Sequence, residues 1–289
     1  MSNTLPFNST MIRGLFTPLP PEQAQDHTPG FRVVLQGASL IVPVGPQQML
    51  LSEGELPSIV SETEPLRIGL WQGKPLRVVR IAPDVILPAE YEALPFQGPD
   101  TCLDNTLATI AGRAAQILHW EQRSCFCSHC GSALVRIPDG WGKRCQSCGD
   151  EHFPHIHPCI IVLVKRGAEL LLIRNAAWNT GRFSLVAGFL DFGESLEECV
   201  QREVCEEAGI EVTNIRYVGS QCWPFPSQQM IGFLADYASG EVMPDGVEVV
   251  EADWFHEDAL PMSPGGKRSI ARWIIDTYGK GTGTGIIPS

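Results

Sequence analysis

Three glutamates lie close together in the stretch from Gly188 to Ile210. Glu203, Glu206 and Glu207 are spaced i, i+3 and i+4, so in a helix their carboxylates share one face within a turn. Unpaired carboxylates at that spacing raise one another's pKa. A divalent cation that prefers oxygen ligands removes the repulsion and acidifies a bound water. The alternative is a solvated acidic helix face with no chemistry of its own.

A helix from Ser195 to about Ala208 must position these carboxylates. Ser195 stands at a cap position, acidic residues fill the first turn, and Gly209 stands where a helix would stop. Leu196, Val200 and Val204 recur every four residues and form an apolar stripe. The sequence therefore predicts an amphipathic helix with a buried side and an acidic side.

The register of the whole stretch resembles the Nudix box, G-x5-E-x7-R-E-U-x-E-E-x-G-U, where U is aliphatic, and every specified position matches. The resemblance implies an α/β/α Nudix sandwich that hydrolyses nucleoside diphosphates linked to another group. It also implies that Glu203, Glu206 and Glu207 bind Mg²⁺ or Mn²⁺, and that Arg202 pairs with Glu194 to brace the loop against the helix. The group that takes the proton from water differs within the family and stays open.

The charge and hydrophobicity of the chain disfavour some classes of function. The chain has 289 residues, 44% of them hydrophobic, with 21 basic and 33 acidic residues and a net charge of 21 − 33 = −12. This balance disfavours a broad nucleic-acid surface. No apolar run is long enough to span a membrane and no signal-like start is present, so we expect a cytoplasmic protein without a membrane contact.

Four of the ten cysteines form two C-x2-C pairs, each followed by glycine. Fourteen residues separate the pairs, a spacing typical of a zinc ribbon. Four thiolates around one Zn²⁺ leave no position for water or substrate, so the zinc is structural. A disulfide pair and a nucleic-acid-binding ribbon are the alternatives, and Cys125 could compete as a ligand. The predicted ligands are Cys127, Cys130, Cys145 and Cys148.

The remaining patterns predict an ordered series of segments. Short apolar runs separated by turns predict strands before residue 100, and the amphipathic stretch Asp104–Arg123 predicts a helix whose apolar side packs internally or forms a subunit interface. Strands and the box follow the ribbon, then a closing helix from about Lys267 to Tyr278. The predicted division is a flexible leader 1–30, an amino-terminal β domain 31–100, a connecting helix 101–123, the ribbon 124–154, the Nudix domain 155–280 and a flexible tail 281–289.

A proline-aromatic loop follows the box. Two prolines fix its backbone and hold Trp223 and Phe225 rigidly, so it could line a pocket for a flat base or simply pack. The loop resembles the SQPWPFPxS motif of NADH pyrophosphatases, from which Cys222 and Gln228 depart. The order of Gly54–Pro57, Trp71–Gly73, ribbon, box and loop resembles the same family across nearly the whole chain.

This resemblance implies hydrolysis of NAD(H) to nicotinamide mononucleotide and AMP, removal of NAD caps from RNA, and a homodimer whose sites draw on both subunits. It further implies Glu248 and the Ala187 carbonyl as metal ligands, Phe189 and Phe153 as partners of the nicotinamide ring, and a backbone contact from Ala271. The implied substrate contacts of the loop are Gln221, Cys222, Trp223, Pro224, Phe225, Pro226, Ser227 and Gln228.

Two other functions remain open. One is a Nudix hydrolase for another diphosphate such as ADP-ribose. The other is a non-catalytic regulator that uses the ribbon on nucleic acid, which the intact box glutamates and the lack of a basic recognition helix disfavour. His152, His155 and His157 could form a second metal site, although their alternate positions at the start of an apolar run are more simply those of a strand entrance.

Overall fold

The computed structural model describes residues 5–22, 28–52, 64–98, 101–261 and 266–280. It separates into two compact units, which we describe one at a time. Unit 1 comprises residues 1–156 together with Trp223–Ser227, and unit 2 comprises 157–222 and 228–289. The Gly54–Pro57 segment and the predicted tail lie outside the described residues.

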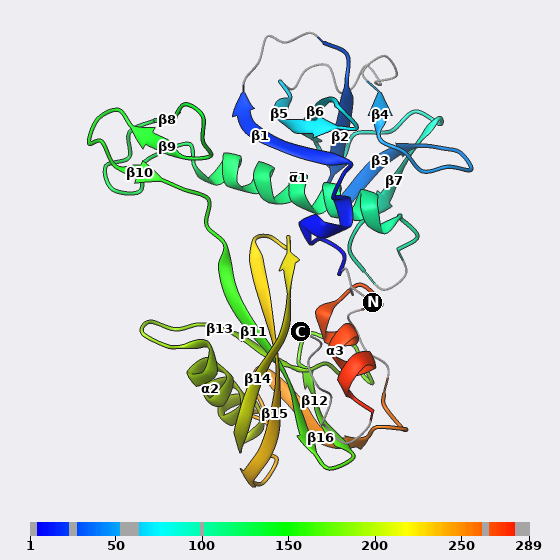
Figure 1. Ribbon diagram of the computed structural model, residues 1–289, viewed down its shortest axis with the longest axis vertical. Helices are drawn as coiled ribbons and strands as arrows, with labels where there is room; N and C mark the ends of the chain where they lie inside the picture. The colour runs from blue at the N-terminus through cyan, green and yellow to red at the C-terminus, as the bar shows by residue number, and fades with distance from the viewer. Residues whose placement is uncertain (1–4, 23–27, 53–63, 99–100, 262–265, 281–289) are drawn as a thin grey trace. The chain divides into compact units, whose positions relative to one another are not determined.

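Unit 1 is built on a mixed sheet with the order β1-β5-β6-β2-β3-β7, in which β4 also pairs with β2 (Figure 1). Only β2 and β6 pair in parallel among these described neighbours. The strands are β1 (Phe16–Glu22), β2 (Phe31–Gln36), β3 (Ser39–Pro43), β4 (Leu51–Ser52), β5 (Leu66–Trp71), β6 (Lys74–Ile81) and β7 (Tyr91–Pro95).

The amino-terminal segment departs from expectation. We predicted a loose leader up to residue 30, whereas a 3-10 helix η1 spans Ser9–Ile12 and β1 pairs antiparallel with β5. The prolines of β1 suit an edge strand, where a missing N–H costs no ladder hydrogen bond. Edge pairing therefore orders a stretch whose composition alone predicts no element.

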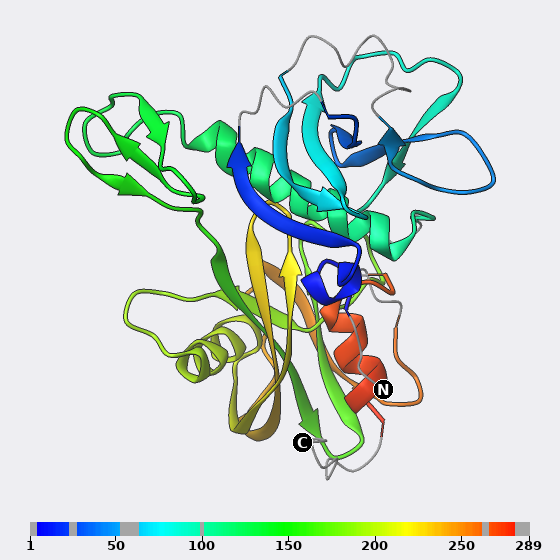
Figure 2. The same ribbon diagram turned by 45° about the horizontal axis from the view of Figure 1, so that its top comes forward.

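Helix α1 (Asn105–Arg123) has the predicted bounds, and the Asp104 side chain accepts hydrogen bonds from the N–H groups of Thr106 and Leu107. Its first half is buried, and it packs on β2, β3 and β6 of the sheet. The apolar face of α1 is thus covered within unit 1, as internal packing predicts. Figure 2 shows the three short strands of the ribbon at the carboxyl end of this helix, β8 (Leu134–Arg136), β9 (Lys143–Cys145) and β10 (Glu151–His152).

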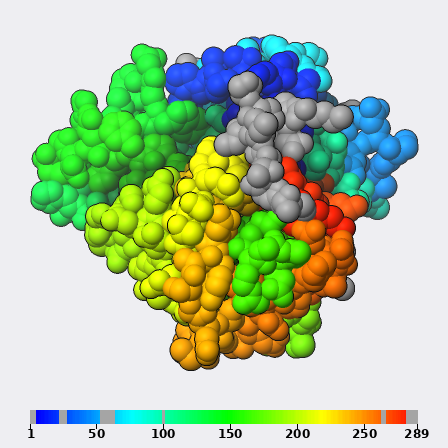
Figure 3. All heavy atoms as spheres, turned by 60° about the horizontal axis from the view of Figure 1, so that its bottom comes forward, coloured from blue at the N-terminus to red at the C-terminus, as the bar shows by residue number. Residues whose placement is uncertain are grey.

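Unit 2 is a six-stranded sheet with the order β14-β15-β11-β12-β16, in which β13 pairs with β11. Helices α2 (Leu196–Ala208) and α3 (Ile270–Tyr278) lie on opposite sides of this sheet (Figure 1), which gives the predicted α/β/α sandwich. Figure 3 shows the green turn between β11 and β12 flanked by the yellow-to-orange strands, as the sheet order requires. The strands are β11 (His157–Arg166), β12 (Glu169–Asn175), β13 (Val186–Phe189), β14 (Ile210–Trp223), β15 (Gln228–Gly240) and β16 (Val249–His256).

Strand β11 is the centre of unit 2. It is buried almost continuously from Cys159 to Lys165, because helices cover both faces of the sheet. Ile160, Val162 and Val164 belong to the core that includes the apolar stripe of α2. On the alternate positions, Lys165 Nζ reaches the Tyr278 carbonyl at the end of α3. Because side chains alternate between the two faces of a strand, β11 packs against α2 on one face and α3 on the other.

Candidate active site and zinc centre

Helix α2 begins and ends where the sequence predicts. Ser195 and Glu198 form a capping box, in which the Glu198 N–H donates to Ser195 Oγ and the Ser195 N–H donates to Glu198. Gly209 closes the helix in the left-handed region with φ 73°. These two caps fix the position of the box glutamates along the chain.

Arg202 is the hub of the acidic cluster. Its Nη2 donates to Glu194 Oε2 at 2.9 Å and to the Phe189 carbonyl at 2.9 Å, while Nη1 donates to Glu203 Oε1 at 2.8 Å. The Arg202 guanidinium lowers the pKa of Glu194 to about 2. The predicted Arg202–Glu194 pair is present, and it ties the loop before α2 to the helix and to β13.

Glu203 is half-buried and Glu207 is buried. Glu207 is 7% exposed, and its Oε2 has neither solvent contact nor a hydrogen-bond partner in the described chain. Burial, followed by repulsion from Glu203 and Glu248, raises the pKa of Glu207 to about 8. Burial also raises the pKa of Glu203. A buried oxygen without a partner beside further carboxylates fits a divalent cation, which supplies the missing positive charge.

Gly188 lets strand β13 and helix α2 approach each other. A Cβ built on Gly188 would lie 1.9 Å from both Cδ and Oε1 of Glu203. No side chain can occupy that space while Glu203 keeps its position. The first glycine of the box is therefore required because the Glu203 carboxylate of the facing helix occupies the space next to it.

Glu248 approaches the cluster from the segment before β16. Its charge acts on both Glu203 and Glu207, as expected of a further ligand. Asp245, which our sequence reasoning missed, accepts hydrogen bonds from the N–H groups of Val247, Glu248 and Val249 at 2.8–3.0 Å. The Asp-Gly pair at 245–246 is the turn signal that could have identified this anchor.

Glu206 and Ala187 are the remaining predicted ligands of the divalent cation. Glu206 has a side chain 60% exposed and pairs with Arg202 Nη1 at 3.0 Å. The Ala187 N–H donates to the Glu207 carboxylate, so Ala187 adjoins the cluster, and the ligand role of its carbonyl stays a prediction.

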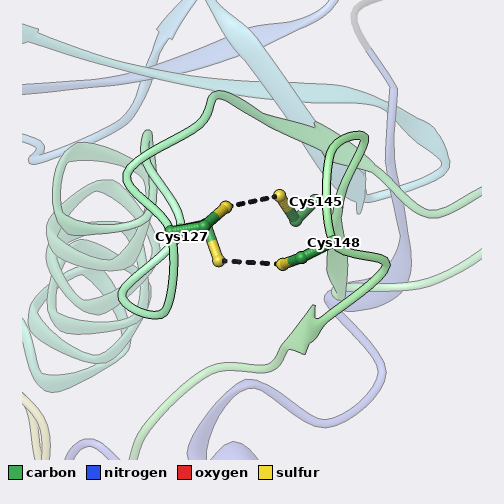
Figure 4. A group of neighbouring side chains, drawn as sticks. Cys127, Cys145 and Cys148 are labelled. Carbon is green, nitrogen blue, oxygen red and sulfur yellow. Dashed lines mark hydrogen bonds between the residues drawn. The ribbon is translucent and has the colours of Figure 1, made fainter.

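The four predicted zinc ligands converge within the ribbon. Cys127 Sγ lies 3.7 Å from Cys148 Sγ, and Cys130 Sγ lies 3.4 Å from Cys145 Sγ. Figure 4 shows Cys127 facing Cys145 and Cys148 across the ribbon. Four sulfurs on one tetrahedral Zn²⁺ are about 3.8 Å apart, whereas a disulfide needs about 2.0 Å. The geometry fits structural zinc.

The remaining ribbon candidates lie outside that set of four. Cys125 Sγ contacts the carbonyls of Glu121 and Gln122 and does not join the four-cysteine cluster. His152 lies in β10 beside Cys127 and Asp150, whereas His155 lies near Trp120 with the two rings tilted and His157 begins β11. These three histidines therefore have different surroundings.

The proline-aromatic loop packs its rings on unit 1, to which Trp223–Ser227 belongs. Phe225 lies between Phe7 and Phe96, with ring centroids 5.5 and 5.8 Å away, and Trp223 meets Phe7 edge-on. Pro224 fills the space above Gly112 of α1. These rings have a packing role within unit 1, and a role in substrate binding stays a prediction. Pro226 is exposed and Ser227 is buried.

Gln221 has a structural task at the start of α3. Its side chain is fully buried, with Nε2 donating to the Arg268 carbonyl at 2.7 Å and Oε1 accepting from the Ile270 N–H at 2.7 Å. Gln221 thereby positions the turn that leads to Ala271, itself buried. Cys222 and Gln228, the two departures from the family motif, are half-buried.

Two predicted aromatic contacts are accessible. Phe153 in unit 1 is 54% exposed and Phe189 in unit 2 is 50% exposed. About half of the surface of each residue is therefore accessible to solvent. In the described chain, no helix is long and apolar enough to span a membrane.

Three family models match successive parts of the chain. The NADH pyrophosphatase-like rudimentary NUDIX domain matches residues 29–120, the NADH pyrophosphatase zinc ribbon domain matches 122–153, and the NUDIX domain matches 154–274. Similar solved structures include a NUDIX hydrolase from Nitrosomonas europaea, 30% identical, covering 47% of this chain and 80% of that chain with a TM-score of 0.42.

Curated relatives are similar over more of the chain. A protein of Pseudomonas fluorescens strain Pf-5 named NAD-capped RNA hydrolase NudC is 42% identical over 215 residues, covering 73% of this chain and 76% of that protein. Its namesake in Pseudomonas entomophila strain L48 is 48% identical over 214 residues with the same coverage. Together with the intact box and the four-cysteine ribbon, these matches show that the chain belongs to the Nudix hydrolase family, in its NADH pyrophosphatase group with a zinc ribbon.

Proposed function

We propose that this protein hydrolyses the pyrophosphate bond of NAD(H) to nicotinamide mononucleotide and AMP, and removes NAD caps from the 5′ ends of RNA. The observation that carries the proposal is the buried Glu207 carboxylate, whose Oε2 has no hydrogen-bond partner among the described residues, beside Glu203 and Glu248, in a chain 42% identical to a protein named NAD-capped RNA hydrolase. Both substrates contain the same diphosphate linkage, so one site can serve both.

The acidic cluster would hold Mg²⁺ or Mn²⁺ through Glu203, Glu206, Glu207 and Glu248, with a further contact from the Ala187 carbonyl. Such a cation neutralises charge on phosphate oxygens and acidifies water when it is bound. Arg202 keeps Glu203 in place through its 2.8 Å hydrogen bond and is itself oriented by Glu194. The chain itself thus contributes a set of carboxylates that are held in position and partly shielded from solvent.

The base and ring contacts of the substrate would come from exposed aromatic side chains. Phe189 follows Gly188 on β13 and is half exposed, so its ring is accessible to a ligand. Phe153 offers a second half-exposed ring for the nicotinamide. The loop from Gln221 to Gln228 and the backbone of Ala271 would complete the contacts.

Two broader features belong to the same proposal. The family resemblance implies a homodimer whose sites use both subunits, which sedimentation of the purified protein would test. A cytoplasmic location suits a ribbon that needs four reduced thiolates. A chain with net charge −12 favours the free dinucleotide over long RNA, unless cations are concentrated locally.

The test is a product analysis in ¹⁸O water. Purified protein is incubated with Mg²⁺ or Mn²⁺ and, in separate reactions, NADH, NAD⁺, NAD-capped RNA and ADP-ribose. We expect nicotinamide mononucleotide and AMP from the dinucleotides, ¹⁸O on a single product phosphate, and uncapped 5′-phosphate RNA. Faster turnover of ADP-ribose than of every NAD substrate would contradict the proposed specificity.

A further inference from the structure

A cavity of about 210 Å³ lies in unit 1, between the β5–β6 hairpin, the last turns of α1 and the ribbon strand β8. Its floor is apolar and includes Leu66 and Val78, which face each other across the two strands, and Leu118 of α1. Its polar lining includes Arg80 and Arg136. The predicted functions of the box and of the zinc do not use this cavity.

Arg80 is a half-buried arginine for which the described residues supply no ion pair. Its Nε is closed off from solvent and has no hydrogen-bond partner, and no ion pair to Arg80 is found among the described residues. Burial lowers the pKa of Arg80. A protein rarely keeps such a charge unless an anion completes it.

The acidic groups of the cavity do not supply that anion. Glu121 receives two hydrogen bonds from Arg136, at 3.1 and 2.9 Å, and an ion pair from Lys143 at 2.8 Å. Two cations already neutralise its single charge. Among the lining residues, Arg80 and Arg136 against Glu64 and Glu121 give 2 − 2 = 0, in a chain whose net charge is −12.

We propose that this cavity is a phosphate-binding site, separate from the acidic cluster, in which Arg80 is the principal ligand and Arg136 adds positive charge. Arginine suits phosphate because its planar fork donates two hydrogen bonds at once. A cavity of 210 Å³ is smaller than the roughly 300–1,000 Å³ of sites that enclose a drug-sized ligand, so it takes one phosphate group with a small substituent and not a dinucleotide.

Titration of the zinc-loaded full chain with inorganic phosphate, in a calorimeter and without added Mg²⁺ or Mn²⁺, tests the site. We expect one phosphate per chain for the wild type. The R80Q variant should bind phosphate at least about 10-fold more weakly, because the charge is lost while a donor remains. The E64Q variant should bind phosphate about 2- to 3-fold more tightly, because a competing anion leaves the rim.

The matched control is R123Q. Arg123 ends α1 one residue beyond Gln122, which lines the cavity, but Arg123 does not line it. R123Q changes the net charge as R80Q does, and its phosphate affinity should stay within about 2-fold of the wild type. Equal losses in R80Q and R123Q, unchanged affinity in R80Q, or no binding by the wild type would each overturn the proposal.

A melting curve separates this role from a structural one. Arg80 has no partner to lose, so R80Q should melt within about 2 °C of the wild type when phosphate is absent. Phosphate should raise the melting temperature of the wild type and R123Q but not of R80Q. A large drop in melting temperature in R80Q without phosphate would assign Arg80 to the fold and overturn the proposal.

The phosphate could belong to a free mononucleotide or to an RNA strand. Parallel titrations with AMP and with a short RNA oligonucleotide distinguish these sources. Arg80-dependent binding of AMP identifies a free phosphate monoester, and Arg80-dependent binding of the oligonucleotide alone identifies the RNA backbone. NADH hydrolysis by R80Q should remain at the wild-type rate, so failure of this site and failure of the proposed function are distinguishable.

Discussion

At the scale of single residues, the Glu207 side chain affects both the stability of the fold and the predicted binding of a cation. It is 7% exposed, lies beside Glu203 and Glu248, and has an oxygen without a partner among the described atoms. Folding must place this carboxyl in an unfavourable environment, and a cation would reverse the penalty. Natural active sites commonly carry such local costs.

Replacement of Glu207 by glutamine should lower NADH hydrolysis on the order of 10³-fold or more while the fold is kept, because the isosteric amide loses the charge that holds a cation. Steady-state kinetics and a melting curve without added Mg²⁺ or Mn²⁺ measure both effects. The control is Glu197→Gln on the exposed side of the same helix, which should remain near wild-type activity. Substantial activity in the Glu207 variant would count against the metal role.

The pH dependence of stability follows from the same residue. The pKa of Glu207 is about 8 in the folded protein against 4.5 for an ordinary glutamate, so the cation-free folded state retains a proton that the unfolded chain has released. This contribution, a few kcal/mol at most, is complete below about pH 4.5 and is lost as the pH rises through about 8. We expect Mg²⁺ to raise the melting temperature more at pH 9 than at pH 6.

Comparison with Glu207→Gln isolates this effect. The variant has no carboxyl to titrate, so its stability without cation should change less between pH 6 and pH 9 than that of the wild type. Melting curves of both proteins at several pH values measure the difference. Identical pH profiles for the two proteins would show that Glu207 is not the titrating group.

At the scale of elements, the site depends on how closely β13 approaches α2. Gly188 faces the Glu203 carboxylate with no room for a methyl group, since an added Cβ would meet it at 1.9 Å. Arg202 joins the same two elements through the Phe189 carbonyl. The glycine at position 188 therefore allows the strand to approach the helix closely, and the Arg202 guanidinium connects the strand, the loop and the helix by hydrogen bonds.

Substitution of alanine for Gly188 should displace Glu203, lower activity by about 10²-fold and cost about 1–3 kcal/mol of stability. Kinetics and denaturant unfolding report the two quantities. Gly45→Ala is the matched control, because an added Cβ there meets no atom within 4 Å. A fully active Gly188→Ala enzyme would mean that Glu203 can move without loss.

At the scale of the whole molecule, the two units hold different metal sites. The four-cysteine ribbon lies in unit 1 and the acidic cluster in unit 2. Each metal should therefore protect mainly the unit that binds it. A structural zinc supplies on the order of 10 kcal/mol to its loop-rich segment, far more than a catalytic cation at an open site.

Hydrogen exchange followed by mass spectrometry would test this division. Removal of zinc should increase exchange in residues 125–152, whereas Mg²⁺ should reduce exchange in β13 and α2. The control is the same measurement on Glu207→Gln, in which Mg²⁺ should no longer protect α2. Protection of both units by either metal alone would show that the two sites are coupled.

Sequence reasoning located the elements that carry strong local signals. Ser195 and Gly209 bound α2, Asp104 caps α1, and two C-x2-C pairs converge on one centre, because each signal depends on residues near one another in the chain. It was wrong about the leader, since the pairing of β1 with β5 depends on a strand some fifty residues away. It also missed Asp245, whose value lies in three backbone N–H groups that only the folded turn aligns.

By itself, the sequence determined the family, the zinc ligands, the Arg202–Glu194 pair and the order of the elements, since these depend on local spacing and on the chemistry of side chains. Only the tertiary structure decided that Glu207 is buried while Glu206 is exposed, that Gln221 positions the start of α3, and that Arg80 Nε lacks a partner among the described residues. Burial and pairing depend on residues distant in the chain, and their pKa values and free energies are set only when packing excludes water.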